Sequence, residues 1–200
     1  MRHVLLFRLA AVSALSAGAA LAQGVQNMEI VFLFGGVPGT SQVLGGSQVK
    51  TEGGFANLIT YAYQIHSFKP FDLYFELPMG FWFRGNVTAD GAPATGGGSG
   101  NFFTPGAKFN FHVQPRVAIY GVAGIGFGGF SQYALDPKGN VLVGHHSNHL
   151  AAGLGGGVDF RLTTHLSLRA EARDIVSARH LDGTDSRHRP LFAFGFAMHF

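Results

Sequence analysis

Nine charged side chains stand at alternate positions within apolar stretches of the sequence, and their spacing could support chemistry. Large apolar residues occupy the positions between them, so an extended backbone would place the charges on the opposite face. Four carboxylates and five cations gathered there could act as acid and base, line an ion-conducting bore or pair with one another. Because unpaired buried charges are costly and the two signs nearly balance, we expect a structural ion network and no catalytic residues. The nine residues are Glu29, Glu76, Arg84, Lys108, Asp159, Arg161, Arg169, Glu171 and Arg173.

Histidines gather in two segments outside these stretches. His145, His146 and His149, together with His180 and His188, would suit a transition metal if they met, because neutral imidazole binds Zn, Ni or Cu. The sequence has no Cys, which excludes thiolate metal sites and disulfides. Histidines in polar loops are more often solvated than ligating. We therefore expect no bound metal and no other cofactor.

Residues 124–129 match the pattern G-x-G-x-x-G of dinucleotide-binding proteins. That function needs a helix directly after the glycines, and residues 130–137 offer little helix and end in Pro137. We interpret the glycines instead as positions that make room for a bulky neighbour or allow a strand to bend. Nucleic-acid binding is not indicated either, because without residues 1–22 the formal charge is 12 minus 11, or +1.

The elements that must position the charged residues are strands, and the clearest is residues 190–200. Large apolar side chains recur there at every second position, and small or polar residues lie between them. A period of two predicts a strand with one apolar face. The large residues are Phe192, Phe194, Phe196, Met198 and Phe200.

Eight segments show this alternation, and the connections between them alternate between long and short. We expect long loops at residues 36–54, 85–102, 129–148 and 175–189, and short turns near residues 67–70, 113–115 and 162–165. Long loops on one side and short turns on the other are typical of outer-membrane barrels. The Gly-rich segment 91–100 should be mobile, because it cannot bury enough apolar surface to become ordered. The predicted strands are residues 27–35, 55–66, 72–84, 103–112, 116–128, 149–161, 166–174 and 190–200.

The N-terminus predicts export. Residues 1–22 combine the positive charges of Arg2 and Arg8, an apolar stretch and a terminal Ala-Leu-Ala, which is the pattern of a cleaved signal peptide. Residues 23–200 would form one domain. Charged residues make up only 12% of the chain, against about 25% in soluble domains. A secreted chain that is poor in charge and has no apolar run long enough for a membrane helix favours a closed membrane barrel.

Several segments resemble the small eight-stranded outer-membrane barrels of the OmpA, OmpX, OmpW and Opa type. They are the signal, the sequence LGGGVDFR at 154–161 with its short turn, the sequence LSLRAEAR at 166–173 and the terminal Phe200. The resemblance implies that Phe196, Met198 and Phe200 belong to an assembly signal read by the barrel-assembly machinery. It also implies contact with outer-membrane lipid and lipopolysaccharide. Such proteins include adhesins, membrane-stabilising proteins and a few lipid-modifying enzymes.

His145, Ser147 and Asn148 resemble the H-x-S-N motif of outer-membrane lipid A deacylases. In that family the motif lies close to the C-terminus, whereas 52 residues follow Asn148 in this chain. The acid expected about a dozen residues later would be Asp159. Twelve extended residues span roughly 40 Å, so we expect Asp159 near the opposite rim and out of reach of Ser147.

We therefore predict an all-β protein: an eight-stranded antiparallel transmembrane up-and-down barrel in the bacterial outer membrane, formed after cleavage of the signal peptide. Its function would be structural or surface-interactive, with long extracellular loops that contact an external ligand and a lumen filled by side chains. The alternatives are a narrow channel for solutes or ions, a lipid-modifying enzyme of the lipid A deacylase type, and a soluble lipocalin-like barrel. A soluble barrel would have an apolar lumen and a polar exterior, which is the opposite of the predicted pattern.

Overall fold

The computed structural model describes most of the chain after residue 26, and these residues form strands joined by short connections. The described residues are 27–44, 47–83, 87–89, 92–95, 98–132, 134–135, 141–142, 146–177 and 188–200. They contain no helix long and apolar enough to cross a membrane.

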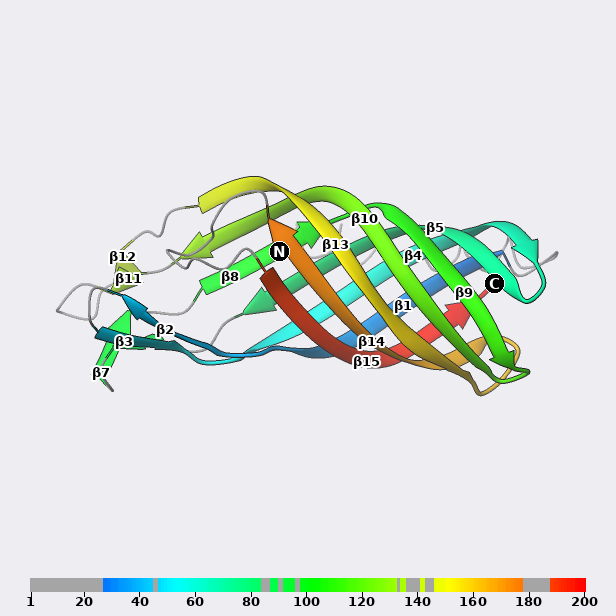
Figure 1. Ribbon diagram of the computed structural model, residues 1–200, viewed down its shortest axis with the longest axis horizontal. Helices are drawn as coiled ribbons and strands as arrows, with labels where there is room; N and C mark the ends of the chain where they lie inside the picture. Colours follow the sequence, from blue (N-terminus) through cyan, green and yellow to red (C-terminus); the bar gives the residue numbers. More distant parts are fainter. Residues whose placement is uncertain are drawn as a thin grey trace, which may run out of the picture.

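A single closed barrel dominates the described part of the chain (Figure 1). Each wall strand is antiparallel to the strands on either side of it, and the last strand pairs with the first. The wall therefore has eight strand positions, as predicted, with β8 and β9 sharing one of them. In order around the barrel the strands are β1 (Met28–Val37), β4 (Gly54–Phe68), β5 (Phe71–Phe83), β8 (Gly98–Phe103) with β9 (Gly106–Gln114), β10 (Val117–Gln132), β13 (His146–Arg161), β14 (Leu166–Ser177) and β15 (His188–His199).

The strands are staggered, and the stagger sets the width of the barrel. Following paired residues once around the wall leads from Asn148 on β13 back to β13 at Val158, which is ten residues further along. With eight strands, such a stagger tilts the strands strongly and leaves an interior that side chains can fill.

The predicted faces are confirmed on every wall strand. On β15, Phe192, Phe194 and Phe196 are exposed, whereas Leu191, Ala193 and Ala197 are buried. The same alternation on the other strands places large apolar residues outside and those predicted charged positions that the structure describes inside. The outer surface is therefore the apolar one.

The fourth predicted strand, residues 103–112, is wrong in its bounds. The structure has two elements at this position, and the break between them lies at Thr104 and Pro105. Pro78 on β5 faces the same break, so two residues without a backbone N–H lie close together there. Gly124 and Gly126 allow the backbone of β10 to lie close to residues 103–105. A Cβ at Gly126 would lie 1.9 Å from the carbonyl oxygen of Phe103.

Parts of the long loops form strands, contrary to the expectation that they would lack order. Beyond one end of the barrel, strands from two long loops pair in a four-stranded sheet, and a third loop contains a two-stranded ladder (Figure 1). Pairing between backbone groups supplies hydrogen bonds without an apolar core, so a polar composition does not prevent these segments from forming strands. The sheet contains β2 (Thr40–Leu44), β3 (Ser47–Thr51), β6 (Val87–Ala89) and β7 (Ala92–Thr95), and the ladder joins β11 (Ala134–Leu135) to β12 (Val141–Leu142).

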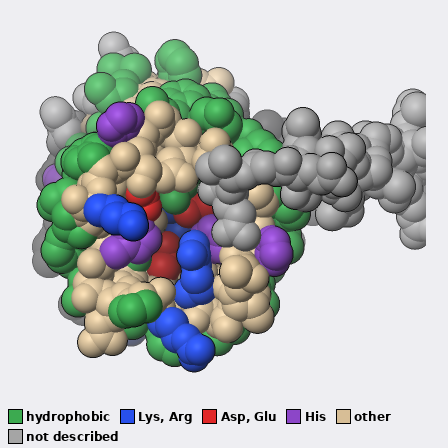
Figure 2. Space-filling model, turned by 90° about the vertical axis from the view of Figure 1, so that its right-hand side faces the viewer, with side chains coloured by type: hydrophobic (Ala, Val, Ile, Leu, Met, Phe, Trp, Pro, Cys, Tyr) green, Lys and Arg blue, Asp and Glu red, His purple; other side chains and the backbone are tan. Residues whose placement is uncertain are grey.

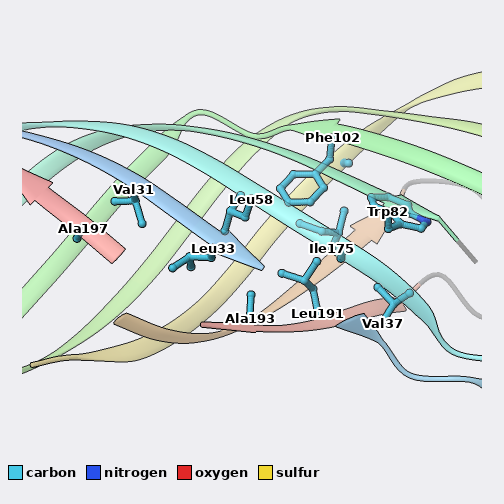
Figure 3. Packing of buried hydrophobic residues seen from close by; sticks show 12 residues of the cluster. Val31, Leu33, Val37, Leu58, Trp82, Phe102, Ile175, Leu191, Ala193 and Ala197 are labelled. Atoms are coloured by element: carbon cyan, nitrogen blue, oxygen red, sulfur yellow. The ribbon is translucent and has the colours of Figure 1, made fainter. Parts of the chain in front are cut away.

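Glycines inside the barrel lie opposite large aromatic side chains, as the sequence interpretation expected. Phe102 is paired with Gly80, Trp82 with Gly100 and Tyr120 with Gly157. A Cβ at Gly80 would lie 2.1 Å from the Phe102 ring, so the ring occupies the space that a side chain would fill. The Phe102 and Trp82 rings are 5.9 Å apart and lie together among the buried residues of the lumen (Figure 3).

Replacing Phe194 with Arg should impair assembly, because Phe194 is 72% exposed on the apolar outer face. A charge near the bilayer midplane of a membrane barrel costs roughly 2–4 kcal/mol. The matched change Phe194→Leu keeps the position apolar and should assemble normally. Heat-modifiable gel mobility of the membrane fraction measures assembly. Normal assembly of Phe194→Arg would contradict the assigned faces.

Gly80→Val should destabilise the barrel by about 1–3 kcal/mol, because the new side chain overlaps the packed Phe102 ring. Gly121→Val is the control. Gly121 lies on the outer face of β10, and the nearest atom to an added Cβ is 4.0 Å away. Urea unfolding of the lipid-reconstituted protein compares the two. Equal stability of both variants would show that the lumen adapts to added volume.

Candidate functional site: the barrel lumen

The lumen is filled by two groups of side chains that differ in chemistry. Toward the long-loop end lies the apolar cluster, and toward the short-turn end lies the ion network (Figures 2 and 3). The apolar cluster includes Leu33, Leu58, Trp82, Phe102, Ile175 and Leu191, each at most 2% exposed. The ion network comprises Glu29, Glu76, Lys108, Asp159, Arg169, Glu171 and Arg173, all buried.

Glu29 on β1 connects three strands of the network. Its Oε2 accepts hydrogen bonds from Lys108 Nζ on β9 and from Arg169 on β14, the latter at 3.0 Å. His199 Nδ1 lies 3.6 Å from Glu29 Oε1, and Ser167 Oγ lies 2.8 Å from His199 Nε2. One carboxylate therefore ties together strands that lie on different sides of the lumen.

Arg169 binds Asp159 in the two-bond geometry that suits a guanidinium and a carboxylate. Its Nε and one terminal nitrogen each donate to Asp159 at 2.5 Å. The guanidinium carbon also lies 4.7 Å from the centre of the Tyr120 ring, and Lys108 Nζ lies 4.3 Å from the Tyr74 ring. These aromatic faces stabilise cations in a space with little water.

Arg173 organises the second part of the network. It donates from Nε to Glu171 at 2.7 Å and from a terminal nitrogen to Glu76 at 3.0 Å. The Tyr120 hydroxyl donates to the other oxygen of Glu171 at 2.9 Å. Tyr120 therefore touches both parts, and the network extends across the lumen without a gap between them.

Seven of the nine sequence-predicted residues meet in this network, and two do not. Arg161 is half-buried at the short-turn end and forms no ion pair with any described residue. Arg84 lies outside the described residues. Sequence reasoning missed Tyr74, Tyr120 and His199, although all three stand at positions that face the lumen. Counting only charged residues at those positions left out the polar aromatic partners.

The apolar cluster was also missed. The expected lumen was polar or small, yet Leu33, Leu58 and Leu191 face inward. The sequence does indicate inward apolar residues here, because residues 30–34 are apolar at every position. Such a run is typical of a strand buried on both faces. Trp82 also faces inward and is 2% exposed.

The short-turn mouth carries a smaller polar group. His112 Nε2 lies 2.5 Å from Asp72 Oδ2, and Gln64 donates to the other oxygen of Asp72 at 3.0 Å. Viewed from this end, charged and His side chains gather in the hollow centre inside a rim of other residues (Figure 2). Two depressions lie at this end, one of about 360 Å³ beside Asp72 and His112 and one of about 30 Å³ beside Arg161.

The deacylase-like residues do not meet. β13 runs without interruption from His146 to Arg161, so Ser147 and Asp159 are twelve residues apart on one strand, or about 40 Å. Asp159 is instead bound to Arg169. The side chains of His146 and Ser147, as well as His145 and His180, lie outside what the structure describes. Among the described residues, no three His, Cys, Asp or Glu side chains are grouped as a metal site would require.

The glycine pattern at 124–129 lies within β10, where the strand continues and no helix follows.

A staggered eight-stranded wall with an apolar exterior and a charged, filled interior defines a small transmembrane barrel of the outer-membrane class. The apolar exterior also shows that the lipocalin alternative is wrong.

The chain belongs to the outer membrane protein beta-barrel domain family, whose model matches residues 7–200. The protein is therefore a small β-barrel of the bacterial outer membrane. In this class the short turns face the periplasm and the long loops face outward. No curated protein matches the chain.

Solved structures share the fold at low sequence identity. Neisserial surface protein A is 18% identical with a TM-score of 0.61, covering 89% of this chain and all of its own. OprG from Pseudomonas aeruginosa is 12% identical with a TM-score of 0.58, covering 88% and 96%. Ail, the attachment invasion locus protein of Yersinia pestis, is 14% identical with a TM-score of 0.53, covering 88% and 100%. Ail has also been solved with the heparin analogue sucrose octasulfate, and that structure has a TM-score of 0.52 with this chain at 12% identity, covering 88% and 100%.

The residues expected to form the assembly signal lie on the closing strand. Phe196 is exposed on the outer face, and Met198 and Phe200 are half-buried. The backbone N–H of Phe200 donates to the carbonyl of Met28 at 2.9 Å, and the Met28 N–H donates back at 3.1 Å. Their role in assembly remains a prediction.

Arg169→Met should destabilise the barrel by about 3–5 kcal/mol, because it leaves Asp159 without its two bonds and removes one partner of Glu29. Arg161→Gln is the control, since Arg161 has no ion pair among the described residues; its effect should stay within about 0.5 kcal/mol. The urea midpoint for loss of the folded gel band measures both. If the two variants unfold at the same midpoint, the network contributes no net stability.

Proposed function

We propose that this protein acts through its surfaces: it strengthens the outer membrane and presents its long loops to partners outside the cell. The observation that carries the proposal is the filled lumen. Apolar side chains occupy one half and paired charges the other, so a solute would have to displace both groups. A barrel closed in this way can contribute through its exterior and its loops but offers no path for transport.

The loop end supports the second part of the proposal. The four-stranded sheet of β2, β3, β6 and β7 extends the protein beyond the wall and gives the loops a defined shape. Ail, which shares the fold, is named the attachment invasion locus protein and has been solved with a heparin analogue. By analogy we propose an extracellular ligand for the loops of this protein and no enzymatic activity.

Biogenesis completes the proposal. We propose that residues 1–22 are a cleaved signal peptide, that residues 23–200 form the barrel domain, and that the barrel-assembly machinery reads the strand containing Phe196, Met198 and Phe200. The mature barrel would then lie among phospholipid and lipopolysaccharide.

Purified protein in planar lipid bilayers should give no stable conductance, because eight strands with filled interiors leave no water-filled bore. Phe102→Ala should also stay silent, since the ion network would still close the lumen below the enlarged space. A general porin prepared in the same way serves as the positive control. A reproducible ion-selective current that changes in Glu76→Ala or Arg169→Ala would establish the channel alternative instead.

A further inference from the structure

The apolar outer face of the barrel is interrupted by a polar notch. Asn101 on β8, Gly129 on β10 and Asn148 on β13 are register partners, so they lie side by side on three neighbouring strands. Both asparagines are exposed and stand on the outward positions of their strands. Large apolar residues occupy most outward positions of the wall, so two neighbouring exposed carboxamides distinguish this part of the outer face.

The notch has a shape as well as a polarity. Gly129 contributes no side chain, and a depression of about 390 Å³ lies over this part of the wall. The wall of the depression on its membrane side consists of large apolar residues. They are Met79, Phe103 and Phe127, which are register partners two residues closer to the short-turn end.

The two carboxamides converge on the glycine. A Cβ at Gly129 would lie 2.4 Å from Asn101 Oδ1 and 2.8 Å from Asn148 Oδ1. Neither side chain forms a hydrogen bond with any residue in the described part of the chain. Each carboxamide both donates and accepts, so the pair offers several unused hydrogen-bonding positions directly above an apolar wall.

The notch lies toward the long-loop ends of its strands, where the apolar surface of an outer-membrane barrel meets the headgroups of the outer leaflet. We propose that it binds one outer-leaflet glycolipid of the lipid A type, in which acyl chains are joined to a sugar through amide bonds. An acyl chain would lie against Met79, Phe103 and Phe127. The amide N–H and C=O at the head of that chain would pair with Asn101 and Asn148.

The amide linkage distinguishes this ligand from ordinary phospholipids. Ester-linked chains present a carbonyl but no N–H at the junction with the headgroup, so they can use only half of the capacity of the two carboxamides. The notch adjoins the lipid-facing outer wall of the barrel, so a lipid can enter it directly from the surrounding bilayer. This inference depends on the outer-membrane location and is independent of the surface role proposed for the loops.

Native mass spectrometry of the full-length mature protein, released from detergent micelles, tests the inference. Purified lipid A is the probe and phosphatidylethanolamine the competitor. Wild-type protein should retain one lipid A in preference to phosphatidylethanolamine. The double variant Asn101→Leu/Asn148→Leu should retain lipid A about tenfold less, because a neutral hydrogen bond is typically worth a few-fold in affinity. Gly129→Val, which fills the floor of the notch, should have the same effect.

Asn57→Leu is the matched control. Asn57 stands on an outward position of β4 and is separated from Asn101 by Phe81. This variant makes the same chemical change outside the notch and should leave retention unchanged. Heat-modifiable mobility confirms folding of each variant, and the single variant Asn148→Leu decides the question if the double variant does not fold.

Three results would overturn the inference. The first is equal retention of lipid A and phosphatidylethanolamine by the wild-type protein. The second is undiminished retention by the folded notch variants, and the third is an equal loss in Asn57→Leu. Retention of phosphatidylethanolamine that depends on Asn101 and Asn148 would likewise reject the assignment to an amide-linked glycolipid.

Discussion

Hydrocarbon offers no hydrogen-bond partner to a peptide group, and the rest of this structure depends on how the chain meets that constraint. Each unsatisfied N–H or C=O in the bilayer costs several kcal/mol, so a sheet edge cannot remain open there. The seam between β1 and β15 removes the edge, with pairs from Glu29 and His199 at one end to Gly36 and Phe192 at the other. Closure with a stagger of ten residues then fixes the tilt, and the tilt fixes a narrow lumen.

A narrow lumen imposes a second condition, because every inward side chain must find partners within it. The chain meets this condition in two ways. Where inward residues are apolar, rings such as Phe102 fit over glycines on the neighbouring strand. Where they are charged, each carboxylate of the ion network binds at least one cation, and Tyr120 fills the remaining space while donating to Glu171. Both solutions stabilise the barrel by filling volume in the lumen.

Sequence reasoning recovered the features that depend on local period and failed where distant strands meet. The eight strand positions, the two faces and seven network residues follow from alternation along single strands. The break between β8 and β9 at Thr104 and Pro105 was not predicted, because its cause lies partly on another strand, at Pro78. The pairing of particular cations with particular carboxylates was not predicted either. Glu29 and Arg169 are 140 residues apart in the sequence, and only the register of the closed barrel brings them together. The strands within the long loops depend on pairing between loops, which no single loop sequence reveals.

The tilt of the strands also sets how deep in the membrane each residue of the notch lies. Since the strands are tilted, a row of register partners descends around the barrel by about 3 Å per strand. Asn148 therefore lies nearest the long-loop end, and Asn101, two strands away, lies about 6 Å closer to the membrane centre. An apolar ligand would gain nothing from two carboxamides at different depths, and a soluble polar ligand would gain nothing from the phenylalanines below them. A molecule that changes from polar to apolar over that distance uses both, and at the outer-leaflet boundary that molecule is a lipid at its headgroup junction.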